Sequence, residues 1–129
     1  MRRLGFPVAC FFGVWTAVSA QTVQEPFESG MASWYGVPYH GQRAASGEIY
    51  DQEKLTAAHR TLPFGTRVRV RSLDRDISVV VRINDRGPFV KSRIIDVSHA
   101  AAVRLGMTDG GIVRVTLEVV ELPPTARAY

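Results

Sequence analysis

The chain has 129 residues, a formal net charge of +4, 46% hydrophobic residues and 22% charged residues. These values are typical of one small globular domain; they exclude a largely disordered chain and leave no room for a second core. Loss of Arg2 and Arg3 with the amino-terminal segment described next would leave a charge of +2, which is too small to indicate nucleic-acid binding.

Residues 1–20 have the pattern of a secretory signal peptide. Arg2 and Arg3 precede a nearly continuous apolar run, and the small residues of "VSA" suit cleavage before Gln21. Cys10 raises the alternative of a lipidated cysteine, but "FPVAC" has proline where an aliphatic residue is expected. We therefore predict a periplasmic or secreted protein with no lipid anchor at Cys10. The cleaved chain would contain no cysteine, so it must fold without a disulfide.

Four stretches of the remaining chain have the alternating pattern of β-strands, after a polar leader at 21–30. They are "MASWY" at 31–35, "TRVRVRS" at 66–72, "ISVVVRI" at 77–83 and "IVRVTLEVV" at 112–120. In the last stretch Val115 and Leu117 alternate with Arg114 and Thr116, so the apolar side chains share one face. The polar "LDRD" between the second and third stretches has the length of a hairpin connection.

One segment has clear helix signals. Ser98 can cap a helix over 99–105, and Gly106 suits the left-handed position after its end. A second, short helical turn is possible at 51–57. Many strands with few helices and no disulfide predict a small all-β barrel, because closure removes exposed strand edges. We expect this domain over 31–122, followed by a tail at 123–129.

Polar and aromatic residues gather in three segments, at 32–51, 55–68 and 82–98. The first is rich in Trp and Tyr, whose flat faces suit sugar rings, although for any one of these side chains packing in the core is the favoured interpretation. The second contains His59, and a single histidine is more often a structural hydrogen-bonding group than a catalyst. The third places Asp85 between a β-branched run and a Gly-Pro turn, where a turn alone would also explain it.

Taken together, these segments resemble the rare lipoprotein A (RlpA) family of bacterial proteins, which are distantly similar to expansins. The resemblance covers about residues 31–120 and rests on "ASWYG", "ASGE", "TAAHRTLPFGT", "NDRGPF" and "RIIDVSHAAAVRLGM". It implies a six-stranded double-psi β-barrel that acts as an endolytic peptidoglycan lytic transglycosylase. Such an enzyme cleaves the MurNAc–GlcNAc bond, leaves 1,6-anhydro-MurNAc ends and is best attested on peptide-poor strands. We expect a monomer that needs no cofactor or metal.

The resemblance also implies roles for individual residues. Asp85 would be the general acid that protonates the departing glycosidic oxygen, and it must hold its proton until the substrate arrives. Glu48 would be a second carboxylate that stabilises positive charge on the sugar, and His59 would orient one of the two carboxyl groups. The residues expected to contact substrate are Trp34, Tyr35, His40 and Arg86.

Arg86 must point away from Asp85 in this scheme, because a guanidinium beside the acid would favour loss of its proton. Adjacent side chains on an extended backbone point to opposite faces, and Asp96 is the expected partner for Arg86. Ala44 stands where family members commonly have threonine, and no carboxy-terminal SPOR domain is expected, which leaves septal targeting open.

Two alternatives remain at this point. The first is a non-catalytic module that binds glycan or loosens the wall through the same groove. The second is a metal site built from His40, His59 and Asp85. It is the weaker alternative, because the chain lacks the closely spaced ligand pairs typical of zinc sites.

Overall fold

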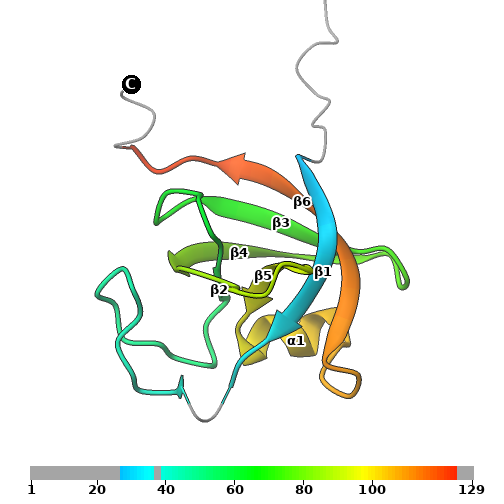
Figure 1. Ribbon diagram of the computed structural model, residues 1–129, viewed down its shortest axis with the longest axis horizontal. Coiled ribbons are helices and arrows are strands. Elements are labelled where there is room, and N and C mark those ends of the chain that lie inside the picture. Colours follow the sequence, from blue (N-terminus) through cyan, green and yellow to red (C-terminus); the bar gives the residue numbers. More distant parts are fainter. Residues whose placement is uncertain (1–26, 37–38, 125–129) are drawn as a thin grey trace, which may run out of the picture.

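The computed structural model describes residues 27–36 and 39–124, which form a six-stranded barrel with one helix (Figure 1). The elements are β1 (Glu28–Trp34), β2 (Thr56–Ala58), β3 (Arg67–Ser72), β4 (Ile77–Asp85), β5 (Arg93–Val97), α1 (His99–Leu105) and β6 (Ile112–Glu121). The strands close in the order β1-β5-β2-β4-β3-β6. The predicted all-β barrel of six strands is therefore confirmed.

Two strand pairs in the barrel are parallel, β1 with β5 and β2 with β4, and the other four pairs are antiparallel. Parallel partners end at the same edge of a sheet. The loops that follow β2 and β4 therefore leave the barrel close together, as do the segments that follow β1 and β5. This arrangement gathers residues from distant parts of the sequence at shared edges.

The barrel interior is filled by the aliphatic side chains that alternate along the strands. Val68 and Val70 of β3, and Val115 and Leu117 of β6, have no exposed surface, as the alternation predicts. Burial of one such side chain contributes roughly 1.5–3 kcal/mol to stability. The arginines that alternate with the β3 valines lie outside the core, where Arg69 donates to Glu118 at 2.8 Å.

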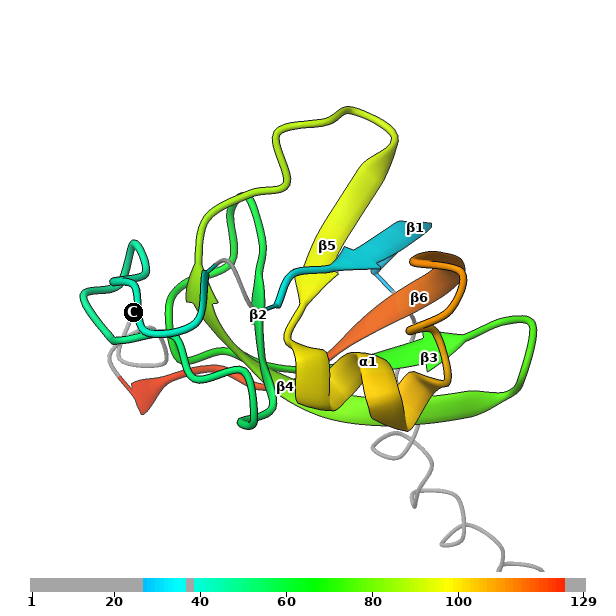
Figure 2. The same cartoon turned by 90° about the horizontal axis from the view of Figure 1, so that it is seen from below.

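Helix α1 has the predicted bounds and both predicted caps. The Ser98 hydroxyl accepts a hydrogen bond from the Ala101 N–H at 3.3 Å, and Gly106 adopts the left-handed conformation at φ 70°. The helix packs against β4, beside which it lies in Figure 2, and it also contacts β1. No helix within 27–36 and 39–124 is both long and apolar enough to cross a membrane.

Three elements differ from the sequence-based expectations. Strand β1 starts at Glu28, so the last residues of the predicted leader at 21–30 belong to the barrel. The segment predicted as a helical turn at 51–57 instead leads into β2, and β5 was not predicted as a strand. The predicted signal peptide, with Cys10, and the last five residues of the predicted tail lie outside the described residues.

Candidate active site

Four residues stand in one row across four neighbouring strands. Ser33 of β1 is the register partner of Asp96 of β5, and Ala58 of β2 is partnered by Asp96 on one side and Asp85 of β4 on the other. Strands lie about 4.8 Å apart, so the two aspartate backbones are separated by roughly 10 Å. The Ala58 side chain is a single methyl group, which leaves space between the two carboxyl groups.

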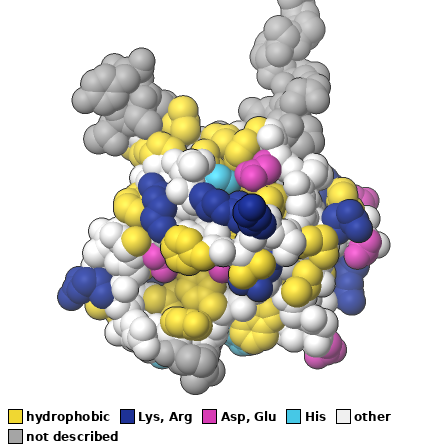
Figure 3. All heavy atoms as spheres, in the orientation of Figure 1, with side chains coloured by type: hydrophobic (Ala, Val, Ile, Leu, Met, Phe, Trp, Pro, Cys, Tyr) yellow, Lys and Arg dark blue, Asp and Glu magenta, His cyan; other side chains and the backbone are white. Residues whose placement is uncertain are grey.

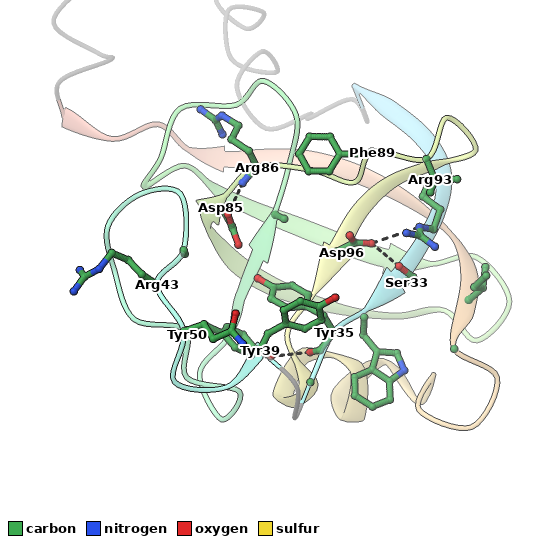
Figure 4. A pocket seen from close by; sticks show the side chains of 18 of the residues that line it. Ser33, Tyr35, Tyr39, Arg43, Tyr50, Asp85, Arg86, Phe89, Arg93 and Asp96 are labelled. Atoms are coloured by element: carbon green, nitrogen blue, oxygen red, sulfur yellow. Dashed lines mark hydrogen bonds and ion pairs between the residues drawn. The ribbon is translucent and has the colours of Figure 1, made fainter.

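This row forms part of a cleft with a volume of about 1070 Å³ (Figure 4). All four row residues line it, together with aromatic side chains that include Tyr35. The face seen in Figure 3 carries hydrophobic side chains, a central group of Lys and Arg side chains and smaller acidic patches. The cleft itself is lined by aromatic side chains and by the carboxyl groups of Asp85 and Asp96, a combination that suits a carbohydrate.

Asp85 is held by the backbone around it. Its Oδ1 atom accepts hydrogen bonds from the Arg86 N–H at 2.8 Å and the Ala45 N–H at 2.9 Å. Its carbonyl accepts from the His59 N–H at 3.1 Å. Within the described residues Oδ2 makes no hydrogen bond and no cationic side chain pairs with the carboxyl group. One oxygen is thus anchored while the other is free to meet a ligand in the cleft.

Asp96 is the second carboxyl group of the cleft, and the sequence-based site did not include it as a functional residue. Its Oδ1 atom accepts a hydrogen bond from the Ser33 hydroxyl and lies 3.6 Å from Nε of Arg93. The Asp96 charge is therefore compensated by a cation and a hydroxyl, unlike that of Asp85. A signal was present in "RIIDVS", where an aspartate interrupts an otherwise apolar run.

Arg86 points away from Asp85, as the sequence-based scheme requires. Its guanidinium donates to the carbonyls of Leu62 at 2.8 Å and His59 at 3.2 Å, and it stacks 4.0 Å from the ring centroid of Phe64. The expected partner, Asp96, was wrong. The carbonyls of the 59–62 turn satisfy the Arg86 guanidinium, so its main role in the unliganded site is to hold that turn.

Glu48, the carboxylate predicted to assist Asp85, forms a two-pronged pair with Arg82, at 2.9 Å and 2.7 Å. The hydrogen bond from Arg82 lowers the pKa of Glu48, which therefore stays ionised at neutral pH. Glu48 does not line the cleft. It lies at the end of the turn that carries Ala45, so the pair fixes the backbone that binds Asp85.

Replacement of Glu48 by Gln is expected to reduce stability in a pH-dependent way. Because the folded-state pKa is below the ordinary value of 4.5, the pair stabilises the fold above that pH, and the contribution disappears as pH falls through the lowered pKa. Both partners are about one-third exposed, so the loss near neutral pH should be about 1 kcal/mol or less. Urea unfolding of both proteins at about pH 7 and about pH 3 checks this. An equal difference at both values would contradict it.

His59 is buried and fixes the start of its own loop. Its Nδ1 atom accepts from the N–H groups of Thr61 at 3.1 Å and Leu62 at 3.2 Å. Because Nδ1 accepts, Nε2 carries the proton and donates to Glu28 at 2.9 Å. The ring bonds neither catalytic candidate, and only the His59 backbone reaches Asp85. Any effect of His59 on the position of Asp85 is therefore exerted through the backbone of the loop. Its partner Glu28 belongs to β1, although the sequence predicted a polar leader there.

His59→Ala is expected to destabilise the protein by about 2 kcal/mol, because two N–H groups lose their acceptor in a buried place. His59→Asn is the matched control, since its side-chain oxygen can replace Nδ1 as acceptor at the same position. Urea unfolding curves of the three proteins measure the difference. If Ala and Asn variants were equally stable, the acceptor role of His59 would be wrong.

The other predicted contact residues divide into two groups. Trp34, Tyr35 and Arg86 line the cleft. His40 does not line it; its Nδ1 atom accepts from the Gln52 N–H at 3.2 Å and its ring meets the edge of Tyr50. Among the described residues no three His, Cys, Asp or Glu side chains come together, so the metal-site alternative lacks its cluster.

Tyr35 has the most unusual hydroxyl group in the cleft. Its ring stacks on Tyr50 with centroids 4.5 Å apart, and its hydroxyl is buried with no hydrogen-bond partner among the described residues. Burial, followed by the nearby charge of Asp85, raises the pKa of Tyr35 far above its ordinary value. The hydroxyl therefore stays protonated and is available as a donor to a ligand.

The closed six-stranded barrel and its carboxyl-lined cleft define a small double-psi barrel protein. Two solved structures share the fold. The Streptomyces papain inhibitor is 23% identical, with a TM-score of 0.60 over 77% of this chain and 100% of its own. The expansin of Clavibacter michiganensis is 19% identical, with a TM-score of 0.59 over 74% of this chain and 50% of its own. At these identities the likeness establishes the fold alone.

The sequence comparisons then define the family. A family model described as lytic transglycolase matches residues 27–117, so the chain belongs to that family. It is 52% identical over 80% of its length to a probable endolytic peptidoglycan transglycosylase RlpA of Synechocystis, and 52% identical over 72% to the endolytic peptidoglycan transglycosylase RlpA of Vibrio cholerae. The resemblance to the RlpA family is confirmed. The aligned part is 32% and 35% of those two relatives, so the chain spans about a third of their length.

Proposed function

We propose that this chain is an endolytic peptidoglycan lytic transglycosylase that cleaves the MurNAc–GlcNAc bond and leaves a 1,6-anhydro-MurNAc end. The observation that carries the proposal is the pair of carboxyl groups, Asp85 and Asp96, on either side of the small Ala58 in an aromatic cleft. The names of the Synechocystis and Vibrio cholerae relatives, a probable and a named endolytic peptidoglycan transglycosylase, support the same activity for this chain.

The proposed reaction needs one acid that becomes a base. Asp85 gives its proton to the glycosidic oxygen as the bond from that oxygen to the MurNAc anomeric carbon breaks. The MurNAc 6-hydroxyl then attacks the anomeric carbon and passes its proton to the Asp85 carboxylate. The acid is regenerated, the new bond is internal to the sugar, and no water enters the product.

The surroundings of the two aspartates support a division of roles. Asp85 has one anchored oxygen and one that makes no hydrogen bond within the described part of the chain, so the second oxygen can exchange a proton with a ligand in the cleft. Asp96 is paired with Arg93 and Ser33, and its carboxyl group lines the cleft where it can stabilise the positive charge developing on the sugar. The buried Tyr35 hydroxyl can donate a hydrogen bond to an oxygen atom of the sugar.

A preference for peptide-poor strands is part of the proposal. Removal of a stem peptide leaves a free carboxylate on the MurNAc lactyl group, which a cation can bind. Arg43 and Arg93 line the cleft, and their guanidinium groups are the cations that could bind this carboxylate. The substrate lies outside the cytoplasmic membrane, so the proposal also includes export by the predicted signal peptide and action as a periplasmic or secreted monomer.

Purified protein incubated with intact and with amidase-stripped peptidoglycan tests the function. Release of soluble glycan fragments, faster from the stripped material, is the expected result. The alternative function, a non-catalytic glycan-binding or wall-loosening module, predicts binding to both materials with no soluble product. A catalytically impaired Asp85→Asn protein serves as the control for fragments released by handling.

A further inference from the structure

Phe89 stands at the edge of the cleft with 88% of its surface exposed. It lies on the loop between β4 and β5, which rises above the barrel in Figure 2, and it lines the same cleft as the two aspartates. A phenyl ring left in water contributes nothing to the core. A single exposed apolar residue is ordinary on a protein surface, so exposure alone does not indicate a role.

The loop that carries Phe89 is fixed in place by one side chain. Arg60, from the loop after β2, donates to the carbonyl of Pro88 at 2.9 Å, to that of Val90 at 2.7 Å and to that of Arg93 at 2.6 Å. These three bonds hold the backbone on both sides of Phe89. A guanidinium bound to three carbonyls is a specific arrangement, and it keeps the backbone that carries the exposed ring at a defined position.

Backbone packing gives the Phe89 ring a second constraint. Gly87 has a φ of 129°, which side chains other than that of glycine rarely adopt, and a Cβ atom there would lie 3.4 Å from the Phe89 ring. One edge of the ring thus lies near the Gly87 backbone. With 88% of its surface exposed, the ring leaves its faces open to a ligand.

Aromatic side chains flank the two aspartates. In the view of Figure 4, Asp85 and Asp96 lie between Phe89 on one side and the tyrosine group Tyr35, Tyr39 and Tyr50 on the other. All of these residues line the one cleft. A chain of sugars that places its scissile bond at the aspartates would extend toward both aromatic groups.

We propose that Phe89 is a stacking platform for a sugar ring of the glycan strand, and that Arg60 is the residue that positions it. The inference rests on the proposed function, because it takes peptidoglycan glycan as the occupant of the cleft. Pyranose rings have apolar C–H faces that pack on aromatic rings, and a loop backbone already fixed by Arg60 need not be ordered on binding. Phe89 then adds affinity without touching the reacting atoms.

The test compares Phe89→Ala, Phe89→Trp and Phe89→Leu on amidase-stripped glycan strands. Loss of the ring is expected to raise KM, and the Kd measured by titration calorimetry in an Asp85→Asn background, about tenfold, with kcat nearly unchanged. Trp restores both constants and Leu, which lacks a flat face, restores them only in part. Leu73→Ala, an exposed apolar change in the β3–β4 turn outside the cleft, is the control and changes neither.

The positioning role of Arg60 is tested by the double variant. Arg60→Ala is expected to raise KM and to leave kcat unchanged. In the Phe89→Ala background it should raise KM no further, because the effects of residues that act through one another are not additive. Additive effects, or an Arg60→Ala effect on kcat, would overturn that role.

If wild-type protein cleaves glycan and Phe89→Ala binds it equally well, the platform is refuted. If wild type binds glycan but never cleaves it, the platform stands when Phe89→Ala weakens binding and the enzyme assignment fails. If wild type does not bind at all, both fail.

Discussion

Asp85→Asn is expected to lower the rate of glycan cleavage by at least about 100-fold, the lower end of what a positioned acid–base group contributes. The substitution removes the proton that the departing oxygen needs. It keeps the local structure, because the Asn side-chain oxygen can still accept from the Ala45 and Arg86 N–H groups. Glycan affinity should therefore change little. Initial rates of fragment release, together with the Kd from calorimetry, separate these two effects.

The matched control is Asp74→Asn, the same chemical change at an exposed aspartate in the β3–β4 turn. It should leave rate and affinity unchanged. An Asp85→Asn protein that retains near-normal activity would remove Asp85 from the reaction, and an equal loss in both variants would point to a general effect of charge.

Asp96→Asn is expected to lower kcat by about 100-fold with a smaller change in KM, because the lost charge stabilises the sugar cation chiefly in the transition state. The Asn oxygen can still accept from the Ser33 hydroxyl, so the row across the strands should persist. What changes is the negative charge in the cleft, with Arg93 left without its carboxylate partner.

A shape control separates charge from packing at this position. Ser33→Ala removes the hydrogen bond to Asp96 and keeps its charge. It should therefore cost much less activity than Asp96→Asn. If the two variants were equally impaired, Asp96 would act through its place in the row and not through its charge.

The fold was predictable where residue patterns were local. The alternation of apolar and polar residues predicted β3 and β6, because one face of each strand is buried and the other is exposed to water. Ser98 and Gly106 marked the ends of α1 by their capping chemistry. β2 and β5 were missed for physical reasons. Three residues are too few to show a period, and Ile94 and Ile95 of β5 are both buried, so no alternation appears.

The site, like the fold, was predictable only where the signal was local in the sequence. Motifs pointed to Asp85 and Tyr35, which line the cleft, because each lies in a recognisable motif at the end of a strand. Asp96 was missed as a functional group because its position depends on β5 pairing with β2, a contact between distant parts of the chain. The pairing of Glu48 with Arg82 could not be predicted either, because Arg82 is equally distant in sequence.

The mass of the sugar at the newly formed end tests the central claim most directly. Wild-type protein is incubated with amidase-stripped glycan strands, and the released fragments are analysed by mass spectrometry. Attack by the internal 6-hydroxyl predicts a 1,6-anhydro-MurNAc end, one water lighter than a hydrolysis product, even when the reaction runs in isotopically labelled water. A hydrated reducing end that carries the label would contradict a lytic transglycosylase and identify a hydrolase, whose two carboxyl groups would have to activate water.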